Sequence, residues 1–260
     1  MKRVGGGLCM AEAFSGAKVL AKTAVADVLG RARIAVFGLG GVGSCVAEAL
    51  ARCGVASLTL VDNGKVSVND INRTFYALHS TVGESNVQVA KARIRDIDEE
   101  ILVHTYETFY NEETAGMFDL SNYDYIVDTI DNAASKVLLI ENAKRSKTPV
   151  ISCMDVWDKL DPSRLEVMDI SRTGVGPLAR VVRTQLRKKG IRKVKVLCSR
   201  EKNDWKTENS QEGDSLSFVA GTAGFMLAGA VVRDLLGKES DSQPRGKRMG
   251  RKNKNRKYEE

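Results

Sequence analysis

A glycine-rich loop between two short apolar segments constrains the fold of this chain more than any other feature. The apolar run at residues 34–37 leads directly into Gly38-Leu-Gly-Gly-Val-Gly43, residues 44–53 follow with a helical pattern, and a second apolar run at 58–61 ends at Asp62. Strand, glycine loop, helix, strand and acid in this order are typical of a βαβ unit that binds a nucleotide. The loop's N–H groups and the helix N-terminus would face a phosphate, and the acid would accept hydrogen bonds from a ribose. The nucleotide-binding candidates are Gly38, Gly40, Gly41, Gly43 and Asp62.

The same alternation continues along the chain. An expected helix over 14–30 precedes the βαβ unit, and further helices are expected at 85–98 and 135–146, with strands at 102–106, 125–129 and 150–153. Strands that alternate with helices pack as a mainly parallel sheet with helices on both faces. The sequence therefore predicts an α/β protein with a Rossmann-like fold.

The pattern changes after Lys159, and we expect a C-terminal α+β extension of the same domain. Its expected elements are strands at 165–169 and 193–198, a basic helix at 177–189 and a long apolar helix at 217–236. The small residues of that last helix suit close packing or a dimer contact. We expect a flexible N-terminus at 1–13, one nucleotide-binding domain with its extension at 14–237, and a basic disordered tail at 238–260.

Positive charge gathers in two segments of this 260-residue chain, whose net charge is +7. Residues 180–202 carry +9 and residues 238–260 carry +5, so the rest of the chain carries −7. A basic segment on an acidic protein favours a partner rich in phosphate, with contacts that do not read sequence. The alternative is a solvated charged surface. The candidate phosphate-binding residues of the expected helix are Arg180, Arg183, Arg187, Lys188 and Lys189.

The residues after Asp62 favour ATP over NAD as the nucleotide. Arg73 can form bidentate contacts with phosphate oxygens, and Asn69 and Asn72 lie beside it. Asp131 follows an expected strand at the edge where open α/β sheets bind ligands, and its carboxylate could hold magnesium. Hydride transfer needs neither residue, whereas adenylyl transfer suits both, so we assign catalytic roles to Arg73 and Asp131.

These motifs resemble the ThiF/MoeB family of ubiquitin-activating-type adenylyltransferases. The resemblance is carried by Gly38–Gly43, Asp62, Asn69-x-x-Asn72-Arg73, residues 77–83 and Asp128-Thr-Ile-Asp131. Lys159–Pro162, residues 169–180 and Ser215–Val219 further resemble the branch of tRNA threonylcarbamoyladenosine dehydratases (TcdA, also called CsdL).

The resemblance implies an ATP-dependent reaction on tRNA. The carboxylate of threonylcarbamoyladenosine beside the anticodon would be adenylated and would then close to a cyclic, dehydrated product. It also implies magnesium, a homodimer, tRNA contacts by the basic helix, and sulfur-transfer proteins of the cysteine desulfurase type as partners.

Three positions depart from the family pattern. Gly16 stands where an arginine is usual, Asn86 stands where a lysine is usual, and Asp155-Val-Trp-Asp158 replaces a glycine-rich turn. Lys91, Lys65 or Arg93 could supply a replacement cation, and we assign Lys91 to the nucleotide. A catalytically weakened or inactive nucleotide- or RNA-binding protein is therefore one alternative, and an adenylyltransferase for a small carrier protein is another.

Cysteine usage and hydropathy exclude several other classes. The five cysteines form no C-x-x-C pair, which argues against a zinc site of paired cysteines and against a disulfide framework. No apolar run reaches the length of about 18 residues that a membrane span needs. We expect a cytoplasmic protein without a membrane span.

Overall fold

One mostly parallel sheet organises the computed structural model, which describes residues 25–174, 176–202 and 216–242. The sheet has seven strands in the order β3-β2-β1-β4-β5-β7-β6, and every pairing is parallel except that of β6 with β7. The strands are β1 (Arg33–Phe37), β2 (Ser57–Val61), β3 (Leu102–Tyr106), β4 (Tyr125–Asp128), β5 (Val150–Cys153), β6 (Leu165–Asp169) and β7 (Lys195–Ser199). The expected Rossmann-like α/β fold is confirmed.

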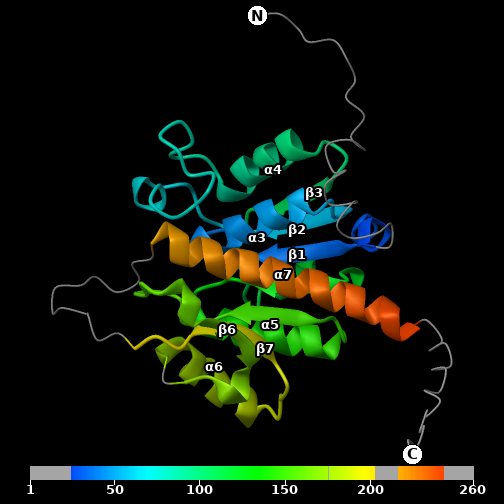
Figure 1. The fold of residues 1–260 in the computed structure, drawn as a ribbon, viewed down its shortest axis with the longest axis vertical. Helices are drawn as coiled ribbons and strands as arrows, with labels where there is room; N and C mark the ends of the chain where they lie inside the picture. The colour runs from blue at the N-terminus through cyan, green and yellow to red at the C-terminus, as the bar shows by residue number, and fades with distance from the viewer. Residues whose placement is uncertain (1–24, 175, 203–215, 243–260) are drawn as a thin grey trace, which may run out of the picture.

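Helices cover both faces of this sheet (Figure 1). The helices are α3 (Gly41–Arg52), α4 (Asn86–Ile97), α5 (Ala133–Arg145), α6 (Pro177–Lys188) and α7 (Ser217–Ser242), with 3-10 turns η1 (Val68–Asp70), η2 (Ala115–Met117), η3 (Leu120–Asn122), η4 (Pro162–Arg164) and η5 (Ile170–Arg172). Within β1, Ile34 and Val36 face the core of α3, α4 and α7, whereas Ala35 and Phe37 face that of α5 and α6. Both faces of the strand are therefore buried, as its unbroken apolar sequence requires.

The chain changes direction within the sheet between β1 and β4. Strands β2 and β3 extend the sheet on one side of β1, while β4, β5, β7 and β6 extend it on the other. The helices that follow β1 and β4 lie on opposite faces, so the loops at the carboxyl ends of these two strands diverge and leave a crevice between them.

The C-terminal extension adds to the same sheet. Strand β7 pairs with β5 in parallel, and β6 pairs with β7 as an antiparallel edge strand. Helix α7 crosses the face that α3 also covers and packs against it (Figure 1). Its Asp234 accepts hydrogen bonds from Lys195 on β7 and from Tyr125 on β4, so polar contacts also attach α7 to the sheet.

Helix α7 is long and apolar enough over Ser217–Gly237 to cross a membrane by length and composition alone, and 56% of that window is buried inside the protein. This burial is typical of a core helix. The helix continues to Ser242, past the domain boundary expected at residue 237. After residue 237, Lys238 and Glu239 are residue types that favour helices, and the next proline is Pro244. The sequence from 238 to 242 therefore contains no strong helix breaker.

The other expected elements differ from the structure mainly at their ends. Helix α3 begins at Gly41, inside the glycine motif, rather than at residue 44, and β7 begins at Lys195 rather than at 193. Residues 25–29 are helical and belong to the helix expected at 14–30. The N-terminus at 1–13, Gly16 and the tail beyond Ser242 lie outside the described residues.

Candidate nucleotide-binding site

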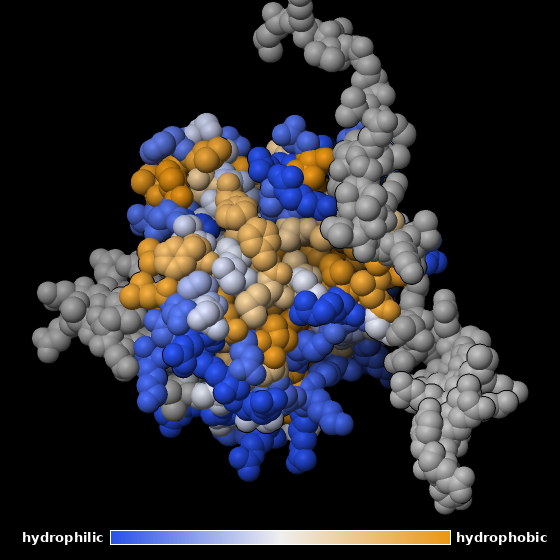
Figure 2. Space-filling model, viewed as in Figure 1, coloured by the Kyte–Doolittle hydropathy of each residue, from blue (hydrophilic) through white to orange (hydrophobic). Residues whose placement is uncertain are grey.

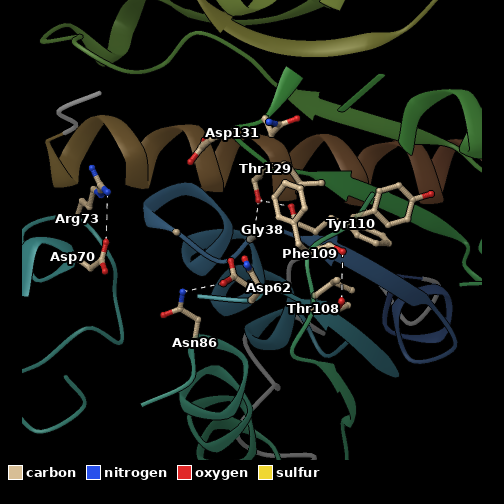
Figure 3. Close-up of a pocket in the computed structure, with 16 residues that line it drawn as sticks. Gly38, Asp62, Asp70, Arg73, Asn86, Thr108, Phe109, Tyr110, Thr129 and Asp131 are labelled. Atoms are coloured by element: carbon tan, nitrogen blue, oxygen red, sulfur yellow. Dashed lines mark hydrogen bonds and ion pairs between the residues drawn. The ribbon is translucent and has the colours of Figure 1, made fainter. Parts of the chain in front are cut away.

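A cavity of about 370 Å³ opens at the carboxyl ends of β1, β2 and β4, where the chain changes direction in the sheet (Figure 3). It combines the glycine loop with carboxylates, one arginine and aromatic rings. Its lining residues are Phe37, Gly38, Gly40, Val61, Asp62, Asn63, Asp70, Arg73, Asn86, Thr108, Phe109, Tyr110, Thr129, Ile130, Asp131 and Asn132.

The backbone excludes a side chain at Gly38 and Gly43, whereas Gly40 leaves open space at the cavity. Gly38 has a φ of +89°, and a Cβ there would lie 2.7 Å from the Thr129 carbonyl oxygen. A Cβ on Gly43 would lie 1.9 Å from the Gly38 carbonyl oxygen, so Gly43 lets α3 pack against the loop. Gly40 is the N-cap residue of α3, and a Cβ there would meet nothing within 4 Å. Because Gly40 lines the cavity, the space beside it is available to a ligand.

Asp62 holds the glycine loop in place as well as facing the cavity. Its Oδ2 accepts a hydrogen bond of 2.7 Å from the Leu39 N–H, and its Oδ1 accepts one of 2.6 Å from the Gly64 N–H. Asn86 donates to the same Oδ1 at 3.1 Å (Figure 3). The carboxylate therefore joins the end of β2 to the loop after β1 and to the start of α4.

Arg73 reaches the cavity from the segment after η1. Its guanidinium lies 3.5 Å from a carboxylate oxygen of Asp70 and 5.8 Å from the ring centre of Trp157. The side chain is only 24% exposed. A cation in this position can neutralise the charge of a phosphate with little competition from bulk water.

Asp131 lines the cavity beyond the end of β4, between Arg73 and Thr129 in the view of Figure 3. Its side chain reaches solvent, but the surrounding elements leave it little water, and this desolvation raises the pKa of its carboxyl against the opposing effects of Lys136 and Arg73. Beneath it, the buried Asp128 carboxylate accepts hydrogen bonds from Lys136 Nζ at 3.1 Å and from the Ser152 hydroxyl. This buried ion pair fixes the loop that carries Asp131.

Comparison with known proteins assigns the chain to a family. A model of the ThiF family matches residues 17–258. The chain belongs to the ThiF family. This finding confirms the resemblance that the motifs indicated.

Members of the tRNA-modifying branch are among the similar proteins. The chain is 40% identical over 226 residues to the tRNA threonylcarbamoyladenosine dehydratase of Bacillus subtilis, which covers 81% of this chain and 89% of that protein. The corresponding Haemophilus influenzae protein is 39% identical over 160 residues, 62% of this chain and 61% of that protein. The structure of E. coli tRNA N6-threonylcarbamoyladenosine dehydratase, TcdA, in complex with ATP superposes with a TM-score of 0.83 at 29% identity, covering 90% of this chain and 97% of that one.

The ThiF-family fold brings only part of the predicted nucleotide set to the cavity. Gly38, Gly40, Asp62, Arg73 and Asp131 line it. Gly41 and Gly43 are buried in the first turn of α3 behind them. Asn69 and Asn72 are exposed, Lys91 is half-buried, and none of these three is among the lining residues.

Arg93 and Lys65 do not line the cavity either. Arg93 forms an ion pair with Glu48 at 3.0 Å, which ties α4 to α3. Asn86, at the position where the family usually has lysine, does line the cavity and contacts Asp62.

The sequence interpretation did not single out the segment after β3. Thr108, Phe109 and Tyr110 line the cavity, and the Phe109 ring is 39% exposed. Asn63 and Asn132 also line it. All five follow the carboxyl ends of parallel strands, and applying that rule to every strand, not only to β1, β2 and β4, would have found them.

The predicted phosphate-binding residues of α6 fall into two groups. Arg180, Arg187 and Lys188 are exposed, and so is Lys189, which directly follows α6. Arg183 donates to the Thr173 carbonyl oxygen at 2.6 Å and to its hydroxyl at 2.8 Å, and Lys189 pairs with Glu141 at 2.8 Å. The second group therefore also attaches α6 to neighbouring elements.

The acidic segment Asp155–Asp158 does not add a free negative charge at the cavity through Asp155. The Asp155 carboxylate is buried and accepts hydrogen bonds from the N–H groups of Leu178 and Ala179, at 2.9 and 2.8 Å. It therefore caps the N-terminus of α6, where a negative charge is stabilising. Gly176 leaves room for this contact, because a Cβ there would lie 2.2 Å from the carboxylate.

The cavity fits ATP, and the space beside Gly40 is the observation that supports this. Backbone at the start of α3 faces a region that a side chain would fill, and a helix N-terminus favours phosphate there. Within the described residues, no group of three or more His, Cys, Asp or Glu could hold a metal by itself. Magnesium usually binds through one or two carboxylates together with substrate phosphates, and Asp131 provides one such carboxylate.

Proposed function

We propose that this ThiF-family chain binds ATP and dehydrates N6-threonylcarbamoyladenosine beside the tRNA anticodon to its cyclic form. The observation that carries the proposal is the 40% identity to the Bacillus subtilis tRNA threonylcarbamoyladenosine dehydratase, over 89% of that protein. The likeness to the ATP complex of the E. coli enzyme, over 97% of that chain, supports ATP as the nucleotide. The cavity that the glycine loop lines supports the same site, because it lies where the strand order in the sheet reverses.

ATP supplies the activation: the carboxylate of the modified adenosine displaces pyrophosphate, and ring closure by the nearby nitrogen then releases AMP. The N–H groups at the start of α3 stabilise phosphate oxygens. Arg73 neutralises charge that develops on the phosphates, an effect worth roughly 3 kcal/mol for one preorganised donor. Asp62 orients the loop and accepts from the ribose, while the exposed Phe109 ring offers a surface for the adenine to stack on.

Magnesium belongs to this proposal through Asp131. Its carboxylate follows the end of β4 and lines the cavity. A bound cation would favour the ionised carboxylate and so oppose the desolvation that raises its pKa. Asn69, Asn72 and Lys91 would contribute to nucleotide binding only from outside the present cavity lining.

The basic helix α6 is the proposed tRNA contact. Arg180, Arg187 and Lys188 are exposed and can contact phosphates directly, and Arg183 and Lys189 add positive charge beside them. Charge reversal at Arg180 and Arg187 should weaken tRNA binding and reduce its salt dependence, since each phosphate contact contributes to the salt slope. An unchanged salt slope in the double variant would contradict this contact.

An exposed apolar patch supports a homodimer. Phe218 and Phe225 on α7 are 51% and 47% exposed, and Phe75 contacts Phe225 with ring centres 5.8 Å apart. Figure 2 shows the hydrophobic surface over α7 and its neighbours. Large exposed apolar patches mark interaction surfaces. On the resemblance alone, we further propose a single domain that begins near residue 14 and includes α7, a cytoplasmic location and sulfur-transfer partners of the cysteine desulfurase type.

Mass spectrometry of nucleosides from threonylcarbamoylated tRNA, after incubation with the protein, ATP and magnesium, tests the activity. We expect loss of the mass of one water that depends on ATP and is abolished in Asp131→Ala. Omitting magnesium tests the metal separately.

Two other outcomes would replace the proposal. ATP binding without any mass change would identify a nucleotide- or RNA-binding protein that has lost the reaction. ATP–pyrophosphate exchange that requires a protein C-terminus and no tRNA would identify an adenylyltransferase for a small carrier protein.

A further inference from the structure

Trp157 provides a contact to Arg73 from a segment far along the chain. The guanidinium carbon of Arg73 lies 5.8 Å from the centre of the Trp157 ring. Tryptophan is the aromatic side chain that attracts a cation most strongly, and the attraction acts within about 6 Å of the ring centre. Arg73 lines the nucleotide cavity, whereas Trp157 is not among the lining residues. The ring therefore contacts the arginine without belonging to the cavity wall.

The neighbours of Trp157 hold its ring in a fixed place. Asp155 is buried and bound to the first turn of α6, and Val156 is fully buried in the core. Asp158 is buried as well and has a φ of +55°. The backbone on both sides of Trp157 is thus fixed by packing and hydrogen bonds, so the half-buried ring is a rigid surface for the guanidinium.

Arg73 is consequently oriented from two sides. The Asp70 carboxylate lies 3.5 Å from one of its guanidinium nitrogens, and the Trp157 ring lies against the guanidinium carbon at 5.8 Å. A long side chain loses considerable rotamer entropy when a phosphate orders it, and prior ordering removes part of that cost from binding. A ring also attracts the cation without neutralising it, so the arginine keeps its positive charge for the nucleotide.

We propose that Trp157 is a positioning residue that holds the Arg73 guanidinium toward the phosphates of ATP. The proposal rests on the proposed function, because it assumes that Arg73 contacts ATP. It assigns a purpose to Asp155-Val-Trp-Asp158, the segment that departs from the family's glycine-rich turn. A glycine-rich turn has no side chain that could order an arginine, whereas this chain has a rigid indole.

Substitution of the ring tests the positioning role. Trp157→Leu removes the ring and retains apolar bulk, and we expect kcat/KM for ATP in tRNA dehydration to fall about three- to tenfold. Trp157→Phe retains a ring face and should recover part of that loss. In the Arg73→Ala background, Trp157→Leu should have no further effect, because the residue through which it acts is gone. Equal losses in both backgrounds would overturn the proposal, as would a Trp157→Phe variant as impaired as Trp157→Leu.

Tryptophan fluorescence gives a second readout that does not need turnover. The chain has two tryptophans, and Trp205 lies outside the described residues. In Trp205→Phe, the remaining fluorescence comes from Trp157, and ATP should change it because the guanidinium beside the ring moves onto phosphate. The change should disappear in Trp205→Phe/Arg73→Ala measured at saturating ATP.

These measurements separate failure of the inference from failure of the proposed function. Calorimetric titration of the wild-type protein with ATP that detects no binding would refute the proposed function. ATP binding with unchanged Trp157 fluorescence, together with equal kcat/KM in wild type and Trp157→Leu, would refute the positioning role alone. Thermal unfolding of each variant shows whether it is folded. If Trp157→Leu does not fold, the ATP titration of Trp157 fluorescence in Trp205→Phe tests the positioning role instead.

Discussion

At single positions of the glycine loop, the neighbours of each residue decide what a substitution would change. Gly43 leaves no room for a side chain, because an added Cβ would lie 1.9 Å from the Gly38 carbonyl oxygen. An added Cβ on Gly40 would meet no protein atom within 4 Å, and its φ of −70° suits any residue. Substitution at Gly43 should therefore affect the fold, whereas substitution at Gly40 should affect the ligand.

Gly40→Ala should lower ATP affinity about tenfold while the free energy of unfolding changes by less than about 1 kcal/mol, since only the N-cap preference of α3 is altered. Calorimetric titration and chemical unfolding measure the two effects. Gly116→Ala is the matched control, because Gly116 also has nothing within 4 Å and lies away from the cavity. Unchanged ATP affinity in Gly40→Ala would place the phosphates elsewhere.

Asp131 should destabilise the folded protein when it is ionised. Desolvation raises the pKa of its carboxyl, so the folded state holds the proton more tightly than the unfolded chain does. The stability that this tighter proton binding gives the folded state is therefore fully present below the ordinary pKa of aspartate. It is lost as pH rises through the raised pKa of Asp131. Asp131→Asn, which cannot ionise, should match the wild type near pH 3 and be more stable than it at pH 7.

Urea unfolding of both proteins between pH 3 and 7, without nucleotide, measures this difference. Asp119→Asn is a control of opposite sign, because hydrogen bonds from Ser121 lower the pKa of the Asp119 carboxyl and this substitution should cost stability at pH 7. A wild type more stable than Asp131→Asn at pH 7 would contradict the argument. Asp131→Asn should also lose dehydratase activity. This loss would show that the charge of Asp131 is needed for the reaction although it destabilises the fold.

At the scale of the elements, helix α6 depends on a carboxylate from a different segment. Its own N-cap residue is Gly176, which has no side chain to accept a hydrogen bond, and Asp155 accepts from the N–H groups of the second and third helical residues instead. The loop after β5 therefore fixes where the basic helix starts, and the same loop carries Trp157. This loop therefore supports both the predicted tRNA contact of α6 and the contact between Trp157 and Arg73.

Asp155→Ala should lower the free energy of unfolding by about 1–2 kcal/mol, the cost of losing a helix cap. Asp161→Ala is the matched control, because Asp161 caps only the short turn η4 from an exposed position and should cost less. Chemical unfolding compares the two, and equal effects would show that Asp155 does not stabilise α6. Asp155→Ala should also weaken tRNA binding if α6 contacts tRNA.

Local patterns predicted the elements better than the contacts between them. The apolar run, glycines and acid from residue 34 to Asp62 are adjacent in sequence, so their order alone predicted the βαβ unit and much of the cavity. Arg183 was interpreted only as a phosphate contact because its partner Thr173 lies outside the helix. The sequence did not reveal that Asp155 caps α6, because its partners on that helix are separated from it by η4, β6 and η5. Periodicity contains no information on such pairs.

For the whole molecule, the apolar patch of Phe218, Phe225 and Phe75 predicts an association that one chain cannot satisfy. Phe218→Glu would place a charge in the proposed dimer contact, where an unpaired buried charge is costly. Light scattering after size exclusion should show a dimer for the wild type and a monomer for Phe218→Glu. Met117→Glu, at another apolar side chain that is 56% exposed, should remain dimeric. A monomeric wild type would contradict the assignment of this patch.

The departure at Gly16 makes this test informative about activity too. The resemblance implies that related adenylyltransferases use an arginine at that position to reach the ATP of the neighbouring subunit, and this chain has no side chain there. Dissociation of the dimer should therefore remove the packing of α7 against the partner subunit. It should not remove a catalytic cation at position 16, because glycine provides none. We expect the Phe218→Glu monomer to unfold more readily while its affinity for ATP stays within about threefold of that of the dimer, a change of less than about 0.7 kcal/mol. A larger loss of affinity would show that another residue of the partner subunit completes the nucleotide site.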